Sequence, residues 1–552
     1  MKGRCPFRTF RWLKLETFHA IIKELQIDMK RSYHRMERAM HKKGRTDVKG
    51  KMALLLFLMA GLLVAGCGKS LENGKGTEGA GNGKSEIRMA ISIDPDGLDP
   101  HRTAAAATFQ ITNNIYDTLV DVTPDGQMVP GLAKDWTVSE DGLSITFHLK
   151  KGVHFHNGKE VTAEDVKYSF ERLKSEESPK ASNYANITDI RVDDPYTITF
   201  LTENPDTALV SNFAYPWAAI VPKDSGDELK NHPVGTGPYM LEEWVPQQHI
   251  ILKKNPENAD AKLETIKFIM IPDATSQILA LKSGEVDIIQ INGDQAAQFK
   301  KDPDYKILEM EMNAVQLMAM NSKNKALGDV RVRQAIAHAI DRKALIDTVW
   351  FGYGKEIGSH FPPMLKEYVD TTDVLPYDPE KAKQLLAEAG YDGGLTLEMY
   401  LPTAYPFYVD AGQIIAHQLK EVGIQVNIHT IEWGTWLSDV YTNRNYDLTV
   451  VGHNGRLDPY ALLSRYETDS GENYMNYSNE KVDEILANIR KEKDEEKRTE
   501  LFKKLQLLLA EEVPAYYIQS PILLYVTGKN VEGFRAYPID IYEMKDVYFT
   551  KP

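Results

Sequence analysis

The segment Leu143-Ser-Ile-Thr-Phe-His-Leu-Lys-Lys-Gly-Val-His-Phe-His-Asn-Gly-Lys-Glu-Val-Thr-Ala-Glu-Asp165 contains signals for three consecutive elements. Residues 143–149 alternate apolar and polar side chains, which predicts a half-buried strand. Asn157-Gly158 is a pair that favours a hairpin turn. Thr162-Ala-Glu-Asp165 combines an N-cap threonine with an acidic residue three positions later. It therefore predicts the start of a helix that runs to about Leu173.

Further elements are predicted on both sides of this segment. Residues 87–93 and 197–201 have strand patterns, and residues 108–120 have a helix pattern. The region 129–232 is richer in strands than the rest of the chain. Beyond it, Pro233-Val-Gly-Thr-Gly-Pro-Tyr239 is dense in glycine and proline, which favours turns.

Helices and strands alternate through the second half of the sequence. This order is typical of an α/β lobe with a partly parallel sheet. Residues 329–349 are predicted to form one long helix, because Val332, Ile336 and their apolar neighbours fall on one face. Other predicted helices cover 275–282, 379–389, 410–421, 479–491 and 497–511, and predicted strands cover 286–290, 426–431, 446–451 and 515–526.

Size and charge exclude several classes of protein. The chain has 552 residues and a net charge of −14. Residues 1–66 hold 15 Lys+Arg and 5 Asp+Glu and so contribute +10, which leaves −24 on the remaining 486 residues. So long a chain needs two or more lobes. Its acidic balance argues against nucleic acid as a partner, because phosphates are bound by basic patches.

Residues 49–67 have the organisation of an export signal. Two lysines precede an apolar run over 52–65, which has the length of a signal-peptide core and is short for a spanning helix. Val64-Ala-Gly-Cys67 resembles a bacterial lipobox. That resemblance implies that residues 49–66 are removed and that Cys67 carries diacylglycerol, which would hold the protein on a membrane. A plain signal peptide and a buried apolar segment are the alternatives.

The segments beside this signal have separate interpretations. Residues 1–48 are interpreted as a non-native or disordered extension, produced by a gene start placed too early, with the real start at Met36 or Met40. A genuine cytoplasmic extension is the alternative. Residues 67–85 are rich in glycine and predict a flexible tether. With Cys67 lipidated and Cys5 removed, the mature fold would contain no disulfide.

The sequence holds no recognisable catalytic motif. Gly-x-Ser-x-Gly, His-Glu-x-x-His and a catalytic cysteine are all absent from it, so we expect no enzymatic activity and no cofactor. His154 and His156 would point to one side of a strand and could be two metal ligands. No third ligand lies close in sequence, and a surface strand explains the pair equally simply.

Several fragments in a consistent order resemble the extracellular solute-binding proteins, family 5, of peptide, nickel and opine ABC importers. The resemblance covers about residues 86–552, and a lipobox upstream is usual for such proteins in Gram-positive bacteria. The matching fragments are Leu98-Asp-Pro-His101, Ile115-Tyr-Asp-Thr-Leu-Val120, Phe147–Gly158, Val161-Thr-Ala-Glu-Asp-Val166, residues 233–239, Arg331-Val-Arg-Gln-Ala-Ile336, Ala339-Ile-Asp-Arg342 and Tyr377-Asp-Pro-Glu-Lys-Ala382.

This resemblance implies an α/β, two-lobed fold like that of periplasmic binding proteins, of the type II, large peptide-binding class. Lobe I would comprise residues 86–128, 233–319 and 512–552. An extra subdomain on lobe I would span 129–232, and lobe II would span 320–511. The lobes would close over a ligand, so residues from both should contact it.

The resemblance also implies where a ligand would bind. Trp433 matches a family tryptophan that lines the cavity. In oligopeptide and dipeptide binders, the loop matching Gly452-His-Asn-Gly-Arg-Leu-Asp-Pro459 carries an aspartate that pairs with the ligand's α-amino group. Here Arg456 falls near that position. Candidate ligand contacts are His453, Asn454, Arg456 and Asp458 in this loop, Trp433, and Thr108, Phe109 and Tyr116 in the N-terminal contact region.

The arginine in this loop favours a ligand that carries a carboxylate, because a buried cation needs an anionic partner and the guanidinium fork suits a carboxylate. Arg456 could instead pair with Asp458 or with another residue of lobe II. Asp458 may equally cap the following helix. His453 offers a second role, because an imidazole could complete the coordination of a chelated metal.

Three functions follow from the resemblance and from the motifs. The first is a monomeric, lipid-anchored receptor on the extracytoplasmic face of the cell membrane. It would capture peptides or related solutes and deliver them to an ABC permease with its ATPase subunits. The second is a binder of nickel chelates or opine metallophores, and the third is a signalling or adhesion lipoprotein without transport.

Overall fold

The computed structural model describes residues 85–551 apart from 207 and 259. All of these residues belong to one compact unit of the chain. The predicted extension, the signal peptide, Cys67 and nearly all of the tether lie outside the described residues. Within the described range, no helix is long and apolar enough to cross a membrane.

Short apolar segments that are far apart in sequence form the sheet of what we call the first lobe. Strand β1 (Glu86–Ile91) lies between β10 (Thr265–Met270) and β11 (Ile288–Ile291) and is parallel to both. Strands β9 (His249–Lys254) and β8 (Tyr239–Val245) extend this sheet in antiparallel order. The apolar side chains of these strands form the core of the lobe.

The sheet of the second lobe is partly parallel, as the sequence predicts. Strand β13 (Ala314–Met320), in which every residue is buried, pairs antiparallel with β17 (Leu448–Asn454). Strand β15 (Leu395–Pro402) is parallel to β17 and to β16 (Ile424–Ile431). Helix α10 (Pro406–Glu421) makes the crossover from β15 to β16 and packs on the sheet, as a parallel connection requires.

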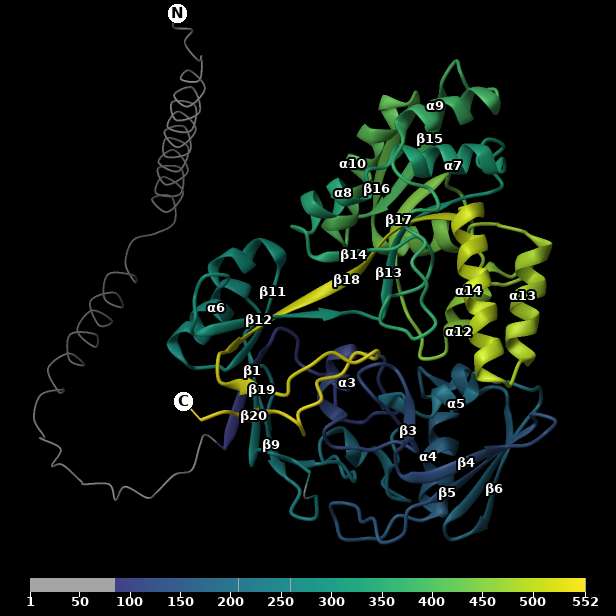
Figure 1. Ribbon diagram of the computed structural model, residues 1–552. Helices are drawn as coiled ribbons and strands as arrows, with labels where there is room; N and C mark the ends of the chain where they lie inside the picture. Colours follow the sequence, from purple (N-terminus) through teal and green to yellow (C-terminus); the bar gives the residue numbers. More distant parts are fainter. Residues whose placement is uncertain (1–84, 207, 259, 552) are drawn as a thin grey trace, which may run out of the picture. The chain divides into compact units, whose positions relative to one another are not determined.

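Strand β18 (Ala515–Gly528) belongs to both lobes. Its first residues pair with β13 and with β14 (Gly354–Glu356), up to Pro521. From Ile522 onward it pairs with β12 (Tyr305–Glu311), and further on with β11. Figure 1 shows β18 running from the strands of the second lobe to those of the first. The strands of the two lobes thereby join into one twelve-stranded sheet. The predicted domain boundaries themselves stay a prediction.

The segment with the clearest sequence signals folds as a separate subdomain. Strands β4 (Ala133–Val138), β5 (Ser144–Leu149), β7 (Thr197–Thr202) and β6 (Ile187–Asp194) form an antiparallel sheet in that order. Helix α4 (Ala163–Leu173) packs on this sheet and begins at the predicted capping box, which is confirmed. The core is aromatic and contains Phe147, Phe170, Tyr184, Phe200 and Phe213.

The remaining elements connect or cover these sheets. The helices are α3 (Ala106–Thr112), α5 (Leu209–Asn212), α6 (Ala274–Ser283), α7 (Val330–Ala339), α8 (Arg342–Val349), α9 (Pro379–Glu388), α11 (Trp433–Thr435), α12 (Pro459–Leu463), α13 (Glu480–Lys491) and α14 (Glu495–Glu512). The short helical turns are η1 (Ala181–Tyr184), η2 (Pro216–Ala218), η3 (Gly226–Lys230), η4 (Gly293–Gln298), η5 (Trp436–Thr442) and η6 (Ser464–Tyr466). The remaining strands are β2 (Val120–Val122), β3 (Met128–Pro130), β19 (Val531–Glu532) and β20 (Tyr548–Phe549).

Two predicted helices are wrong in their extent. The helix expected over 108–120 ends at Thr112, because the side chain of Asn114 bonds the backbone of the C-terminal segment at Tyr542 and Met544. The helix expected over 329–349 breaks into α7 and α8. Ile340 has an extended backbone there, and the carboxylate of Asp341 accepts a hydrogen bond from the Ala344 N–H, so it caps a new helix.

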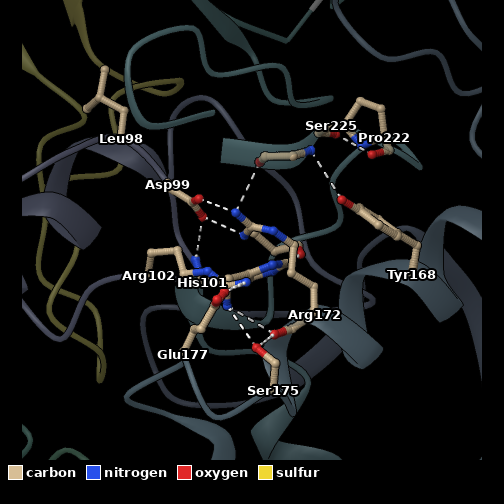
Figure 2. A network of polar contacts seen from close by, with 12 residues as sticks. Leu98, Asp99, His101, Arg102, Tyr168, Arg172, Ser175, Glu177, Pro222 and Ser225 are labelled. Atoms are coloured by element: carbon tan, nitrogen blue, oxygen red, sulfur yellow. Dashed lines mark hydrogen bonds and ion pairs between the residues drawn. The ribbon is translucent and has the colours of Figure 1, made fainter. Parts of the chain in front are cut away.

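A buried ion pair links the N-terminal loop to the subdomain (Figure 2). The guanidinium of Arg172, on α4, makes two hydrogen bonds to the carboxylate of Asp99, and both side chains are about 95% buried. The backbone N–H of His101 also donates to Asp99, over 3.0 Å. Nearby, Arg102 pairs with Glu177 at 2.7 Å on the surface. The two pairs therefore lie in one network but differ strongly in burial.

Replacing Asp99 by Ala should leave the Arg172 charge buried without its partner. Loss of one member of a buried pair costs about 3–5 kcal/mol. We therefore expect the free energy of unfolding of D99A, measured by urea denaturation, to fall by about that amount.

The matched control is Glu177→Ala, which removes the exposed pair of the same network. Its expected loss is under about 1 kcal/mol. Equal losses for the two variants would show that burial does not distinguish the two pairs.

Candidate ligand-binding site

The loop after β17 is held where the chain crosses between the lobes. The Gly455 N–H donates to the Asn313 carbonyl over 2.6 Å, and the Asn313 side-chain amide donates to the carbonyls of Arg456 and Pro538. A Cβ on Gly455 would lie 1.7 Å from the Asn313 side-chain oxygen. A larger residue at position 455 would therefore displace the Asn313 side chain.

The next residues of this loop are anchored on both sides. Leu457 is buried in the apolar core of the subdomain, and its N–H donates to the Tyr215 hydroxyl over 2.9 Å. Asp458 caps α12 through the Tyr460 N–H and accepts two 2.8 Å hydrogen bonds from Arg498. Its carboxylate thus has the capping role that the sequence left open, and it does not pair with Arg456.

A cavity of about 250 Å³ lies beside this loop. Its walls come from both lobes and from the subdomain. They are the start of α3 in the first lobe, the η2 turn of the subdomain, the loop after β17 in the second lobe, and the C-terminal segment 534–542. The cavity includes three of the predicted contacts, namely Phe109, Asn454 and Arg456. Ligand contact by these residues stays a prediction.

Five charged side chains line the cavity, and two of them are already paired. Glu311 bonds Lys355, and Arg535 bonds Asp546 at 2.5 Å. The others are Lys180, Arg456 and Asp540. In the part of the chain that the structure describes, none of these three has an ion-pair partner. An unpaired charge in a cavity is available to a ligand.

Lys180 is positioned by aromatic rings. Its ammonium lies 4.6 Å from the ring centre of Trp217 and 5.9 Å from that of Phe109. Partial burial lowers the pKa of Lys180, and the nearby charge of Arg456 lowers it further. Arg456 itself is exposed. The two cations therefore lie close enough to repel each other.

Three other predicted contacts lie away from this cavity. Thr108 is fully buried and donates to Asp96 over 2.8 Å. The hydroxyl of Tyr116 donates to the Leu98 carbonyl, and burial raises its pKa. Trp433 stacks on Trp436 with 4.9 Å between ring centres and is partly buried in the second lobe. The structure does not bring these three residues to the cavity walls.

His453 belongs to a polar network inside the second lobe. Its Nδ1 lies 3.2 Å from both His360 Nε2 and Arg465 Nη1, and its Nε2 lies 3.0 Å from the Tyr474 hydroxyl. Burial lowers the pKa of both histidines well below the usual value, and the charge of Arg465 adds to this effect. Both ring nitrogens therefore have hydrogen-bond partners within the protein, and a role for His453 toward a chelated metal stays a prediction.

The structure also gives His154 and His156 other partners. His154 lies 3.4 Å from a carboxylate oxygen of Glu257. The ring of His156 bonds the backbone of Gly235 and Gly237 in the glycine-rich segment. Among the described residues, no group of three or more His, Cys, Asp or Glu side chains could hold a metal ion.

Sequence reasoning missed several residues of the cavity. Lys180, Tyr215, Trp217 and Asp540 come from separate segments of the chain and match none of the fragments that carry the family resemblance. No local spacing connects them, so only the fold could bring them together.

Two lobes joined by a shared strand, with a cavity lined by both, are typical of solute-binding proteins. The model of the bacterial extracellular solute-binding proteins, family 5, matches residues 127–474, and the chain belongs to this family. The dipeptide-binding protein of Escherichia coli (strain K12) is 28% identical over 494 residues, covering 82% of this chain and 92% of that protein. The glutathione-binding protein GsiB of Salmonella choleraesuis (strain SC-B67) is 27% identical over 474 residues, covering 82% and 92%.

Solved structures agree with this assignment. The structure of HbpA2 from Haemophilus parasuis superposes with a TM-score of 0.80 at 27% identity, and the match covers 84% of this chain and all of that chain. The predicted α/β fold with two lobes is therefore confirmed, together with the family.

Replacing His453 by Gln should change how stability depends on pH. A histidine whose pKa is lowered on folding contributes stability above its unfolded value of about 6.5, and this stability is lost as the pH falls below that value. Between pH 7.5 and 5.0 we expect the free energy of unfolding of H453Q to fall less than that of the unmodified chain. Urea denaturation at the two pH values measures this difference.

His429→Gln is the control, because His429 is exposed on β16 and bonds Glu398 at 2.6 Å. The pH-dependent loss of stability that His453 contributes should persist in this variant, because His453 keeps its own partners. The same pH dependence for H453Q and the unmodified chain would contradict a His453 that is neutral in the folded protein.

Proposed function

We propose that the chain is the substrate-binding component of an ABC importer that captures short peptides or related small solutes and delivers them to a permease. The observation that carries this proposal is the cavity between the two lobes and the subdomain, in which Lys180, Arg456 and Asp540 have no ion-pair partner among the described residues. Family membership and the relatives named for dipeptide and glutathione binding support it.

The charges of the cavity favour a ligand that carries a carboxylate. Arg456 does not use Asp458, so its guanidinium fork is available to a planar anion. A peptide supplies such an anion at its C-terminus, and glutathione supplies two carboxylates. The volume of about 250 Å³ lies just below the range usual for drug-sized ligands, which favours short ligands over long ones.

Opines also carry carboxylates, so an opine remains the second candidate. A nickel chelate is less favoured, because the ring nitrogens of His453 are already bonded within the protein. A signalling or adhesion role would use the same fold. Neighbouring genes for a permease and two ATPases would favour transport over that role.

We propose that the protein lies on the extracytoplasmic face of the cell membrane, held there through a lipid on Cys67. The apolar run 52–65 and the lipobox-like Val64-Ala-Gly-Cys67 support this location. We propose that the protein acts as a monomer.

Native mass spectrometry of the full chain, purified gently from its host, tests the ligand class. A series of small peptide masses is the expected result, because the cavity offers charges for both ends of a peptide. A single small species without a peptide composition would favour the opine, and a bound metal would favour the chelate.

Replacing Arg456 by Ala should weaken binding of the co-purified ligand about tenfold or more, since hydrogen bonds to charged groups contribute about 1.5–3 kcal/mol. Isothermal titration calorimetry measures the affinity. Arg191→Ala is the matched control, because Arg191 pairs with Asp193 on the surface of the subdomain and does not line the cavity. Unchanged affinity of R456A would refute a ligand carboxylate at Arg456.

A further inference from the structure

We propose that the cavity binds zwitterionic peptides in one fixed orientation, with Lys180 and Arg456 holding the carboxylate and Asp540 holding the ammonium group. The inference rests on the proposed peptide-binding function and deepens it, because it assigns the two ends of the ligand to named side chains. Lys180 and Asp540 become residues that determine specificity.

The two cations of the cavity come from different bodies. Lys180 precedes η1 in the subdomain, and Arg456 follows β17 in the second lobe. Both line the same cavity, and no carboxylate of the described residues pairs with either one. Their mutual repulsion shows in the pKa of Lys180, which the charge of Arg456 lowers. A carboxylate bound between them would remove this repulsion.

The position of Lys180 is well defined despite its long side chain. Its ammonium lies over the Trp217 ring and beside Phe109, so aromatic rings hold it at the cavity wall. Aromatic support of this kind lowers the conformational entropy that the side chain loses when it binds an anion. Lys180 is therefore arranged for a ligand even though the described residues offer it no ion pair.

Asp540 supplies the opposite charge. It is exposed on the C-terminal segment, lines the same cavity, and accepts a 2.7 Å hydrogen bond from the Gln110 side chain. It forms no ion pair with Lys180 or Arg456, so it is more than 4 Å from both cationic groups. The remaining acid and base of the wall, Glu311 and Arg535, already have partners. Asp540 is thus the acidic group that the described wall offers to an ammonium.

This orientation reverses the one that the family resemblance suggests. In the matching loop of dipeptide and oligopeptide binders, an aspartate pairs with the ligand's α-amino group. Here that position is near Arg456, and the available carboxylate lies on the C-terminal segment instead. The direction of the bound peptide should therefore be reversed with respect to this loop.

The test combines variants with modified ligands, using calorimetry on the full chain. The probes are dialanine, its C-terminal amide, its N-acetyl derivative, and glutathione as an anionic peptide. The variants are K180M, which keeps an apolar stem on the rings, K180R, which restores the charge, and D540N, which keeps an acceptor for Gln110. Lys151→Met is the matched control, because Lys151 lies 5.0 Å from the ring centre of Tyr196 in the same subdomain but outside the cavity.

We expect K180M to bind dialanine about tenfold more weakly than the unmodified chain, and K180R and K151M to bind it within about twofold. With the C-terminal amide, the unmodified chain should bind weakly and K180M should cause no further loss, because both changes remove the same interaction. In the same way, D540N should weaken dialanine binding but leave binding of N-acetyl-dialanine unchanged.

Three results would overturn the inference. If K180M weakens binding of the C-terminal amide as much as binding of dialanine, and D540N weakens binding of N-acetyl-dialanine as much, neither side chain holds the end of the ligand assigned to it. If K180M binds all probes like the unmodified chain, Lys180 takes no part in recognition, although the chain still binds peptides. If the unmodified chain binds neither dialanine nor glutathione, and no peptide co-purifies, the proposed function itself fails.

Discussion

The pairing of one long strand with two sets of partners determines the rest of this architecture. Strand β18 bonds β13 and β14 in its first half and β12 and β11 in its second half. It is buried along most of its length, so its residues are fixed by two cores at once. Because the two lobes share this strand, the segments next to the point where β18 changes partners are held close together. The cavity forms there, between Met312–Asn313 and the loop after β17.

The loop that carries Arg456 is under three separate constraints. Asn313 bonds its backbone at Gly455 and Arg456, Leu457 inserts into the core of the subdomain, and Asp458 pairs with Arg498. Each constraint uses a neighbour of Arg456 and leaves its guanidinium free of an acidic partner in the described structure. Because the backbone of this loop is already fixed, the loop loses less conformational entropy when a ligand binds.

Local chemistry explains which parts of the structure could be predicted. The capping box at Thr162 is encoded within a few residues and is confirmed. The partly parallel sheet of the second lobe also agrees with the prediction, although strand β15 is not among the predicted elements. The break at Asp341 was missed, because the apolar face of 329–349 continues across it while the cap depends on one carboxylate. Arg456 could be found through the family pattern. Lys180 could not, because its partners Phe109 and Trp217 are brought to it only by the tertiary fold.

The charge distribution connects recognition with closure. Residues beyond the predicted signal carry a net charge of −24, yet the wall of the cavity places Lys180 near Arg456. Lys180 belongs to the subdomain and Arg456 to the second lobe. Their repulsion therefore opposes the approach of these two parts whenever no anion lies between them. An anionic group of the ligand reverses the sign of that interaction and contacts both bodies together. A ligand can shift an equilibrium only through such differential contacts, so a carboxylate that binds as proposed between Lys180 and Arg456 would also stabilise the closed arrangement.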